Sequence, residues 1–430
     1  MNRIWLIAFG DFISFWISFF IILGIRYGSL LNYNIIQRHF VPFLILYLSW
    51  VLTFFLFGLY DLFTIKPTIP HLRRFGLALL VSFIVGILFF YLVSIFGIAP
   101  KTTLFYQVIS FGIISFLLRR VVYILFSKQI TKPVILVGET PYIEELHNTI
   151  VSNPHLGLTL VSYTKNLHES LQKYAQLKNA VFIFEGTFQE IPKKDIVTLY
   201  QNKTEIIDVA EAYERYLHKV PIGYISQAWV IENIKTKKDL IYSFITRTLD
   251  IIISIIILIF SSPFTIISAI GIYLQDHGPI FYSQERVGLN NKVFKLYKLR
   301  SMIIESEKNG AVWSKANDSR VTRIGKIIRK LHIDEIPQMI NILKGELTLV
   351  GPRPERPEFV TPLEQSIPHY ELRHIIRPGF TGWAQIKYHY ANTTESSKEK
   401  FEYDLYYIKN RNFFLDFGII LKTIQIIFTH

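Results

Sequence analysis

Long apolar stretches dominate the first 126 residues of this 430-residue chain, and they constrain its fold more than any other feature. A helix needs about 20 apolar residues to cross the hydrocarbon core of a bilayer. Stretches of about that length lie at 4–25, 40–60, 75–97 and 102–126. No small-residue cleavage site closes the first stretch, so we interpret it as a retained anchor and not as a signal peptide. The sequence therefore predicts four transmembrane helices within residues 1–130.

The overall composition agrees with a membrane protein that carries a large soluble part. Half of the residues are hydrophobic and 15% are aromatic, which is high for a soluble protein. The formal net charge of +13 favours cytoplasmic flanks, anionic lipid headgroups or phosphorylated substrates over nucleic acid. The chain has no cysteine, which excludes disulfides, thiolate catalysis and cysteine-based metal sites.

Basic residues are concentrated in alternate loops of the apolar region. The loop at 61–74 and the exit of the fourth stretch carry Lys66, Arg73, Arg74, Arg119, Arg120, Lys128 and Lys132. The loops at 27–39 and 98–101 carry fewer basic residues. By the positive-inside rule, the N-terminus and everything after residue 127 are predicted to be cytoplasmic. Asp11 lies near one end of the first stretch, which favours a packed residue over a functional polar site.

Residues 131–235 show a different pattern, in which strands alternate with helices. Short β-branched runs at 133–138, 180–186 and 205–210 are separated by helical patterns. This alternation favours a small parallel sheet, so we predict a Rossmann-like α/β domain. Its first turn reads VGETPY and has no glycine triplet, and Glu139 lies where a pyrophosphate would need bare amides. The turn therefore argues against a bound dinucleotide.

A fifth apolar segment, at 248–274, is long enough to cross the membrane, but three features favour a helix that enters and leaves on one side. Ser262 and Pro263 lie in its middle, where proline removes a backbone hydrogen bond and bends a helix. Basic clusters flank both ends, and a crossing would leave one of them outside. Each half is too short to span the bilayer alone at about 1.5 Å per residue. We predict a re-entrant helix broken at Ser262–Pro263, with a kinked spanning helix as the alternative.

The segment HIDEIPQMIN, at residues 332–341, places two adjacent carboxylates in a strongly basic part of the chain. Asp334 is a favoured N-cap, Pro337 suits the first helical turn and Gly345 can end the helix. An ordinary capped helix explains these residues on local grounds. The alternative is an acidic pair, Asp334 and Glu335, held among phosphate-binding cations.

The cations around this pair favour the second interpretation. They include Lys298, Arg300, Arg320, Arg323, Arg353 and Arg377. Arg353 stands between two prolines, which fix φ, so its guanidinium is aimed in a way that suits bidentate phosphate binding. Two acids among such cations suit phosphoryl transfer, with one carboxylate as nucleophile and the other as a ligand of Mg²⁺. A helix N-terminus and the arginines would keep Asp334 ionised. No Walker-type loop is present, which argues against nucleotide binding of the P-loop kind.

Four long motifs in order resemble those of the bacterial sugar transferases. They are GPIFYSQERVG (278–288), FKLYKLRSM (294–302), the run from DSRVTRIG to RPERPEF (318–359) and RPGFTGWAQI (377–386). This family comprises the monotopic polyprenyl-phosphate sugar-1-phosphate transferases that begin exopolysaccharide and O-antigen repeat units. The resemblance covers about 240–430. The leading helices and the α/β region resemble the long form of the family, and the C-terminal region resembles its exopolysaccharide branch.

The resemblance implies a phosphotransferase that works in two steps at the cytoplasmic face of the bacterial inner membrane. Asp334 would attack the β-phosphate of a UDP-sugar and release UMP. The phosphate of undecaprenyl phosphate would then attack the phosphosugar held on the enzyme. Glu335 would bind Mg²⁺. The remaining implied site residues are Lys298, Arg353 and Arg377 at the phosphates, Gln385 near the nucleotide-sugar, and Ser262 and Pro263 as the helix break.

The predicted architecture is four transmembrane helices (1–130), a Rossmann-like domain (131–235) and a mainly helical transferase domain (240–430). Its expected partners are a UDP-sugar, undecaprenyl phosphate and membrane lipids, and not nucleic acid. The alternatives are a membrane-anchored nucleotide-sugar dehydratase or reductase that uses the α/β domain, and a non-enzymatic scaffold of polysaccharide assembly. The sugar, the glycan pathway, the ligand of the α/β domain and the oligomeric state, a homodimer included, stay open.

Overall fold

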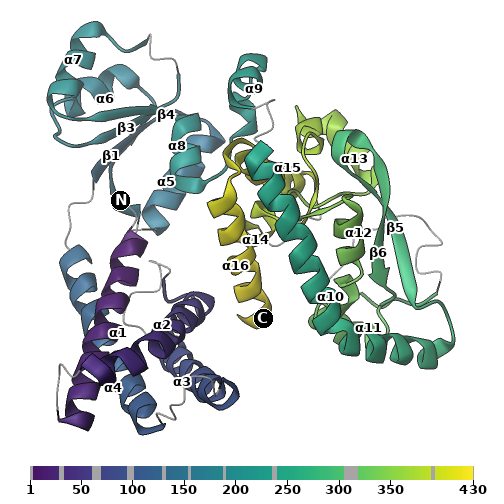
Figure 1. Cartoon of the computed structure of the whole chain (residues 1–430). Coiled ribbons are helices and arrows are strands. Elements are labelled where there is room, and N and C mark those ends of the chain that lie inside the picture. The colour runs from purple at the N-terminus through teal and green to yellow at the C-terminus, as the bar shows by residue number, and fades with distance from the viewer. Residues whose placement is uncertain are drawn as a thin grey trace. The chain divides into compact units, whose positions relative to one another are not determined.

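Contacts between residues divide the chain into two units, Met1–Ile206 with Ile424–His430 and Ile207–Thr423. The structure is a computed structural model, drawn in Figure 1. It describes residues 3–28, 33–60, 69–93, 101–127, 132–153, 156–186, 190–234, 240–304, 318–388 and 393–429.

Four long apolar helices begin the first unit (Figure 1). They are α1 (Arg3–Tyr27), α2 (Tyr33–Leu56), α3 (Ile69–Leu92) and α4 (Lys101–Ser127). Each contains a segment long and apolar enough to cross a membrane, which confirms the four helices predicted from the sequence. Helices α2 and α3 begin several residues before the predicted apolar stretches and include polar residues such as Gln37 and His71. A helix satisfies its own backbone, so its first turns do not require apolar side chains.

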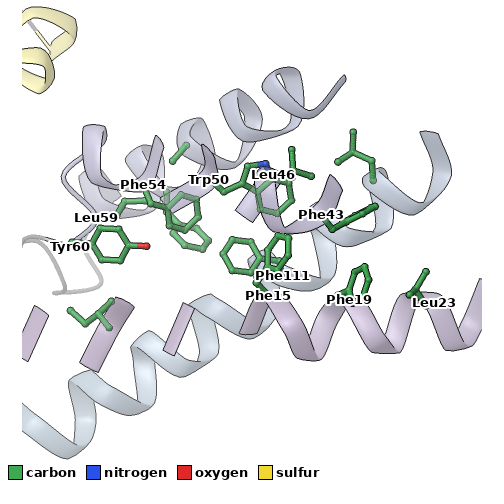
Figure 2. Packing of buried hydrophobic residues seen from close by; sticks show 14 residues of the cluster. Phe15, Phe19, Leu23, Phe43, Leu46, Trp50, Phe54, Leu59, Tyr60 and Phe111 are labelled. Atoms are coloured by element: carbon green, nitrogen blue, oxygen red, sulfur yellow. The ribbon is translucent and has the colours of Figure 1, made fainter. Parts of the chain in front are cut away.

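Aromatic side chains fill the core of this helical bundle. Figure 2 shows Phe15 of α1, Trp50 of α2 and Phe111 of α4 in one cluster. The Phe15 ring meets the rings of Trp50 and Phe111 edge-on, with centroids 5.3 and 5.8 Å apart. The Trp50 indole also donates to the carbonyl of Ser82 on α3 at 3.0 Å. These contacts combine apolar packing with a partner for the buried indole N–H, as large aromatic residues require.

An ion pair is enclosed in the same bundle. Asp11 on α1 pairs with Arg119 on α4, and the two side chains are only 2% and 5% exposed. Ser115 donates to Asp11 at 2.6 Å, and Arg119 donates to the carbonyl of Leu59 at 2.6 Å. Asp11 is thus a packed residue, as expected. Its charge is neutralised by a partner, which a low-dielectric interior demands.

A four-stranded sheet follows the bundle in the sequence. Its strands are β1 (Lys132–Val137), β2 (Leu158–Thr164), β3 (Val181–Phe184) and β4 (Glu205–Asp208), in the order β2-β1-β3-β4. Strand β1 is parallel to both of its neighbours. The connecting helices are α5 (Pro141–Ser152), α6 (Leu167–Tyr174) and α7 (Lys193–Gln201). The predicted alternation of strands and helices is confirmed, but β2 was not predicted. Its exposed residues alternate with residues that are mostly only partly buried, so it forms no continuous apolar run.

The segment that follows β4 belongs to the second unit. It forms α8 (Val209–Ala212), the π-helical turn η5 (Tyr213–Leu217), the 3-10 turn η6 (Ile222–Tyr224) and α9 (Gln227–Asn233). Val220 and Ile222 pack with Phe401 and Leu405 of α15 (Thr394–Asn410). The contacts thus place this segment with the C-terminal part of the chain, before the predicted boundary at residue 235.

The longest helix, α10 (Leu240–Asp276), runs without interruption through Ser262 and Pro263. Its ribbon turns near the middle of the element (Figure 1). Pro263 has no N–H and cannot donate to the carbonyl of Ile259, four residues earlier. The Ser262 hydroxyl donates to that carbonyl instead, at 2.7 Å. The predicted break is therefore a bend within a continuous helix, because the serine replaces the hydrogen bond that the proline removes.

The rest of the second unit is mainly helical, with two small pairs of strands. Strands β5 (Phe281–Val287) and β6 (Val293–Leu299) are antiparallel, whereas β7 (Thr348–Val350) and β8 (Gly379–Thr381) are parallel. The remaining elements are α11 (Arg323–Lys330), η8 (Ile333–Glu335), α12 (Gln338–Lys344), α13 (Pro357–Ser366), η9 (Tyr370–His374), α14 (Trp383–Lys387) and α16 (Phe413–Thr429). The residues of α16 from Ile424 onward are counted with the first unit. Met339 and Ile342 of α12 are buried in the core of this unit.

Candidate active site

Asp334 and Glu335 share the 3-10 turn η8, which precedes α12. His332 begins the turn in the left-handed conformation, with φ of +54°. Pro337, and not Asp334, occupies the N-cap position of α12, so the predicted N-cap role of Asp334 is wrong. A 3-10 turn has about three residues per turn, which directs neighbouring side chains to different sides. Asp334 is buried, with 7% of its surface exposed.

Glu335 is held by two cations from separate elements. Its Oε1 accepts hydrogen bonds from Lys298 Nζ at 2.7 Å and from Arg353 Nη2 at 2.6 Å. Lys298 lies on β6, and Arg353 lies in the loop after β7. These are the short distances of hydrogen bonds between ionised groups. The fold therefore brings two of the predicted cations onto the acidic pair.

The two adjacent carboxyls have pKa values shifted in opposite directions. Burial raises the pKa of Asp334, and the charge of Glu335 raises it further, against the opposing charges of Lys298, Arg329 and His332. Burial also acts to raise the pKa of Glu335, but Arg353 and Lys298 outweigh it and hold that pKa well below its usual range. The expected contribution of a helix N-terminus to the charge of Asp334 is wrong, because Asp334 does not cap α12, and burial raises its pKa. Separated pKa values suit a pair whose members perform different tasks.

The loop that carries Arg353 packs backbone against backbone on the start of β8. A Cβ atom on Gly379 would lie 2.0 Å from the amide nitrogen of Gly351, so both positions need glycine for this close approach. Gly351 N donates to the carbonyl of Thr381 at 2.8 Å. These contacts fix the loop at its first residue. The two prolines that follow restrict φ on both sides of Arg353.

Gln385 lies beside Arg353 at a shared acceptor. Arg353 Nη1 donates to the carbonyl of Phe380 at 3.4 Å, and Gln385 Nε2 donates to the same carbonyl at 3.3 Å. Gln385 Oε1 is buried and accepts no hydrogen bond from the described residues. A buried acceptor of this kind is available to a ligand. The fold thus places a third predicted site residue next to the cation that holds Glu335.

Four other predicted phosphate-binding residues are engaged elsewhere or exposed. Arg300 donates to Asp276 and, at 2.7 Å, to the carbonyl of Pro279. Arg320 donates to both carboxylate oxygens of Asp318, at 2.6 and 2.9 Å. The two residues that are exposed are Arg323, at the start of α11, and Arg377, before β8. The guanidinium groups of Arg300 and Arg320 are therefore already paired with aspartate carboxylates in this structure.

Two charged residues fasten the apolar helix α10 to the elements that follow the acidic pair. Arg247 donates to the carbonyls of Ile342 and Leu343 at 2.6 and 2.8 Å. These carbonyls belong to the last turn of α12, and that of Ile342 also accepts from the amide of Gly345 at 2.9 Å. Asp250 accepts from Thr348 Oγ1 and from Leu349 N, both at 2.9 Å. The position of α12 is thus coupled to the long apolar helix.

Three arginines to which the sequence assigned no site role also act on this site. Arg329, in the last turn of α11, lowers the pKa of Asp334 and is held by Ser301 at 2.8 Å. Arg286 on β5 and Arg373 on η9 donate to carbonyls of the Arg353 loop. Their only sequence signal is a position within or next to the long motifs. Spatial contact cannot be inferred from that position alone.

The donor set at the pair contains two carboxylates. No group of three or more His, Asp or Glu side chains that could hold a metal ion occurs within the described ranges. Mg²⁺ is commonly bound by one or two carboxylates together with waters and substrate phosphates, and not by an all-protein cage. The pair therefore fits a Mg²⁺ ion that is shared with a phosphorylated substrate.

Comparison with known proteins identifies the C-terminal part of the chain. The family model of the bacterial sugar transferases matches residues 241–430. A UDP-N-acetylgalactosamine-undecaprenyl-phosphate N-acetylgalactosaminephosphotransferase of Aeromonas hydrophila is 41% identical over 240 residues, which cover 52% of this chain and 57% of the relative. A putative undecaprenyl-phosphate N-acetylgalactosaminyl 1-phosphate transferase of Bacillus subtilis is 48% identical over 138 residues, 32% of this chain and 77% of the relative.

A third relative is the UDP-glucose:undecaprenyl-phosphate glucose-1-phosphate transferase of Escherichia coli. It is 36% identical over 180 residues, which cover 41% of this chain and 39% of the relative. The matched part thus spans less than two thirds of the Aeromonas and Escherichia proteins, but more than two thirds of the Bacillus protein. The chain belongs to the bacterial sugar transferase family.

Proposed function

We propose that this protein transfers a sugar 1-phosphate from a UDP-sugar to undecaprenyl phosphate, giving undecaprenyl-diphosphate-sugar and UMP. The observation that carries the proposal is the buried Asp334 beside Glu335, which is itself held by Lys298 and Arg353. The related transferases, whose names specify undecaprenyl phosphate, support the same acceptor. The product would be the first lipid-linked unit of an exopolysaccharide or O-antigen type of glycan.

The reaction balances as two displacements at one phosphorus atom. A carboxylate oxygen of Asp334 forms a bond to the β-phosphorus of the UDP-sugar, and the bond to the bridging oxygen breaks so that UMP leaves. A phosphate oxygen of undecaprenyl phosphate then bonds to the same phosphorus and releases the Asp334 carboxylate. The oppositely shifted pKa values support different roles for the two carboxyls, because Lys298 and Arg353 stabilise the charge of Glu335, whereas burial raises the pKa of Asp334.

The cations would bind the phosphate oxygens of the donor. Lys298 and Arg353 already converge on one carboxylate oxygen and can exchange it for phosphate oxygens of similar charge. We assign further contacts with the donor to Arg377 and Gln385. Arg300, Arg320 and Arg323 would contribute positive potential and no direct contact, since the first two are paired with aspartates.

Mg²⁺ is the proposed cofactor, and Glu335 is the residue that would hold it. When bound, it would neutralise charge on the diphosphate and so make attack by an anionic carboxylate easier.

We infer that α10 is re-entrant and that residues 240–430, the proposed transferase domain, act at the cytoplasmic face of the bacterial inner membrane. The bend near the middle of α10 and the Ser262 hydrogen bond to Ile259 support this path. So do the basic residues on both sides of the helix. In a re-entrant helix, Arg247 and Asp250 would lie near the membrane surface, and their hydrogen bonds to α12 and β7 would hold the candidate site close to the phosphate of the acceptor lipid. A spanning α10 is the alternative.

The alternative function, a dehydratase or reductase, would need a dinucleotide site at the α/β sheet, and the structure argues against such a site. Glu185 accepts hydrogen bonds from the amides of Glu139 and Thr140 at 3.1 and 3.2 Å. These amides lie at the N-terminus of α5, where a dinucleotide fold receives a pyrophosphate. A carboxylate of the protein itself thus occupies the place of the anion.

The test is release of UMP by the purified protein. The protein would be incubated with Mg²⁺, undecaprenyl phosphate and a panel of UDP-sugars, led by UDP-N-acetylgalactosamine and UDP-glucose because relatives bear these names. At least one donor should yield UMP, and Asp334→Asn should abolish the yield. No UMP from any donor, or full turnover by the Asn variant, would overturn the proposal.

A further inference from the structure

Four successive carbonyl groups, from Pro352 to Glu355, each accept a hydrogen bond from another part of the second unit. Pro352 O accepts from Gly379 N at 2.9 Å, and Glu355 O accepts from Val287 N at 2.9 Å. The two central carbonyls accept from side chains: Arg353 O from Arg373 at 3.0 Å, and Pro354 O from Arg286 at 2.9 Å. The loop that carries Arg353 is therefore held along its entire backbone.

Arg373 is fixed more firmly than a surface arginine can be. Its side chain is 3% exposed, and its Nη2 atom donates to Asp404 at 2.9 Å as well as to Arg353 O. Its Nη1 atom donates to the Tyr370 hydroxyl. Asp404, on α15, is 1% exposed. Burying such a pair costs desolvation energy that its attraction rarely exceeds, so stability alone is a weak reason for its presence.

We propose that Arg373, held by Asp404, is a positioning residue for Arg353 in the transfer reaction. The inference rests on the proposed function, because it assigns Arg353 to the donor phosphates. Arg373 binds the main-chain carbonyl of Arg353, and Pro354 disfavours the α-helical conformation of the residue that precedes it. Arg373 therefore fixes the backbone from which the Arg353 side chain extends. At the other end of that side chain, Arg353 Nη2 donates to Glu335 Oε1 at 2.6 Å.

The size of the expected effect follows from geometry. A misplacement of about 1 Å in a positioning group can cost about 100-fold in rate. Lysine in place of Arg373 keeps the buried charge but has no planar fork with which to bind Asp404, Tyr370 and the Arg353 carbonyl together. Arg373→Lys should therefore lose activity, but less than Arg373→Met.

The test is a double-mutant cycle between Arg373 and Arg353, read as kcat/KM for a radiolabelled UDP-sugar in the full-length protein. Arg373→Met alone should lower kcat/KM by about 30- to 100-fold. Added to Arg353→Met, it should lower kcat/KM by less than about threefold, because Arg373 acts only through Arg353. An Arg373 effect of equal size in both backgrounds would overturn the proposal, as would an unchanged single variant.

A matched control separates positioning from loss of a buried charge. Lys219 is 1% exposed and pairs with Glu399 and Glu402 of the same helix, α15. Lys219→Met should lower the thermal stability, but its effect on kcat/KM should be the same with and without Arg353. If Arg373→Met does not accumulate, the same cycle can be measured with Arg373→Lys and with Asp404→Asn.

An Asp334→Asn protein, measured in the same experiment, separates the role of Arg373 from the proposed function. If Asp334→Asn keeps turnover, the proposed function fails. If Asp334→Asn is inactive and the cycle is additive, only the role of Arg373 is overturned.

Discussion

Arg353 Nη2 lies 2.6 Å from Oε1 of Glu335, the residue that directly follows the buried Asp334. The contact connects the loop after β7 to the turn η8. It places a cation next to a candidate nucleophile without pairing the nucleophile itself.

Replacing Arg353 should therefore impair catalysis in a graded way. Arg353→Met should lower kcat/KM by about 100-fold or more, and Arg353→Lys by about tenfold, since lysine keeps the charge without the bidentate geometry. Steady-state kinetics of UMP release would measure both. Arg356 offers a control in the same segment, because it pairs with the more exposed Glu358. Equal losses in Arg353→Met and Arg356→Met would contradict the assignment.

The pH dependence should report the raised pKa of Asp334. Only the deprotonated carboxylate can attack, so the acid limb of kcat/KM should lie above the ordinary aspartate pKa of about 3.9. Arg329 lowers the pKa of Asp334, so Arg329→Gln should move this limb to higher pH. The exposed Lys326, on the same helix, supplies the control, and Lys326→Gln should leave the limb in place. A limb that stays fixed or moves to lower pH in Arg329→Gln would argue against Asp334 as the titrating group.

Ser262 should stabilise the bend of α10. Without its hydroxyl, the carbonyl of Ile259 faces Pro263 and loses its donor, so Ser262→Ala should cost about 1–3 kcal/mol. Ser261→Ala is the matched control. Ser261 also donates to a carbonyl, that of Ile257 at 2.6 Å, but this carbonyl lies four residues before a residue that has an N–H. Thermal unfolding in detergent should show a larger loss for Ser262→Ala, and equal losses would refute the compensating role.

Asp11→Asn should destabilise the helical bundle. It leaves the enclosed charge of Arg119 without its partner, and breaking a buried pair from one side costs about 3–5 kcal/mol. The double variant Asp11→Asn with Arg119→Gln removes both charges and should recover part of that loss. Thermal unfolding of the three proteins would measure the difference. A double variant less stable than Asp11→Asn would show that the pair does not act as a unit.

Single cysteines can test the path of α10, because the natural chain contains none. Phe244→Cys and His277→Cys would place one thiol near each end of the helix. A re-entrant helix keeps both ends on one side, so neither thiol should react with an impermeant reagent added to sealed cells, while both react after lysis. Labelling of one end only would show that α10 crosses the membrane and would contradict the re-entrant path.

The sequence predicted the parts of the fold whose signal is continuous along the chain. Four helices contain long windows of high hydropathy, and the buried strands β1 and β3 contain the short apolar runs PVILV and VFIF. Strand β2 gave no such run, because half of its side chains face away from the core. The 3-10 turn at Asp334 was mistaken for a helix N-cap, since Asp followed by Pro within a turn suits both structures.

At the candidate site, the sequence predicted that cations surround the acidic pair, but it did not predict which of them contact the pair. Lys298 and Arg353 meet at Glu335, but Arg300 is committed to Asp276, although it is only two residues from Lys298. Residues at i and i+2 of a strand share a face, but β6 ends at Leu299, before Arg300, so only the tertiary fold decides which of the two residues meets η8. For the same reason, Arg373 and Arg286 had no recognisable role before their carbonyl partners were known.

The most direct measurement of the central claim is the intact mass of the protein after incubation with Mg²⁺ and a UDP-sugar in the absence of the lipid acceptor. The account predicts a mass increase equal to one sugar phosphate, located on the peptide that contains Asp334. The adduct should disappear on addition of undecaprenyl phosphate and should be absent from Asp334→Asn. UMP release without any adduct, or an adduct on a different residue, would contradict the account.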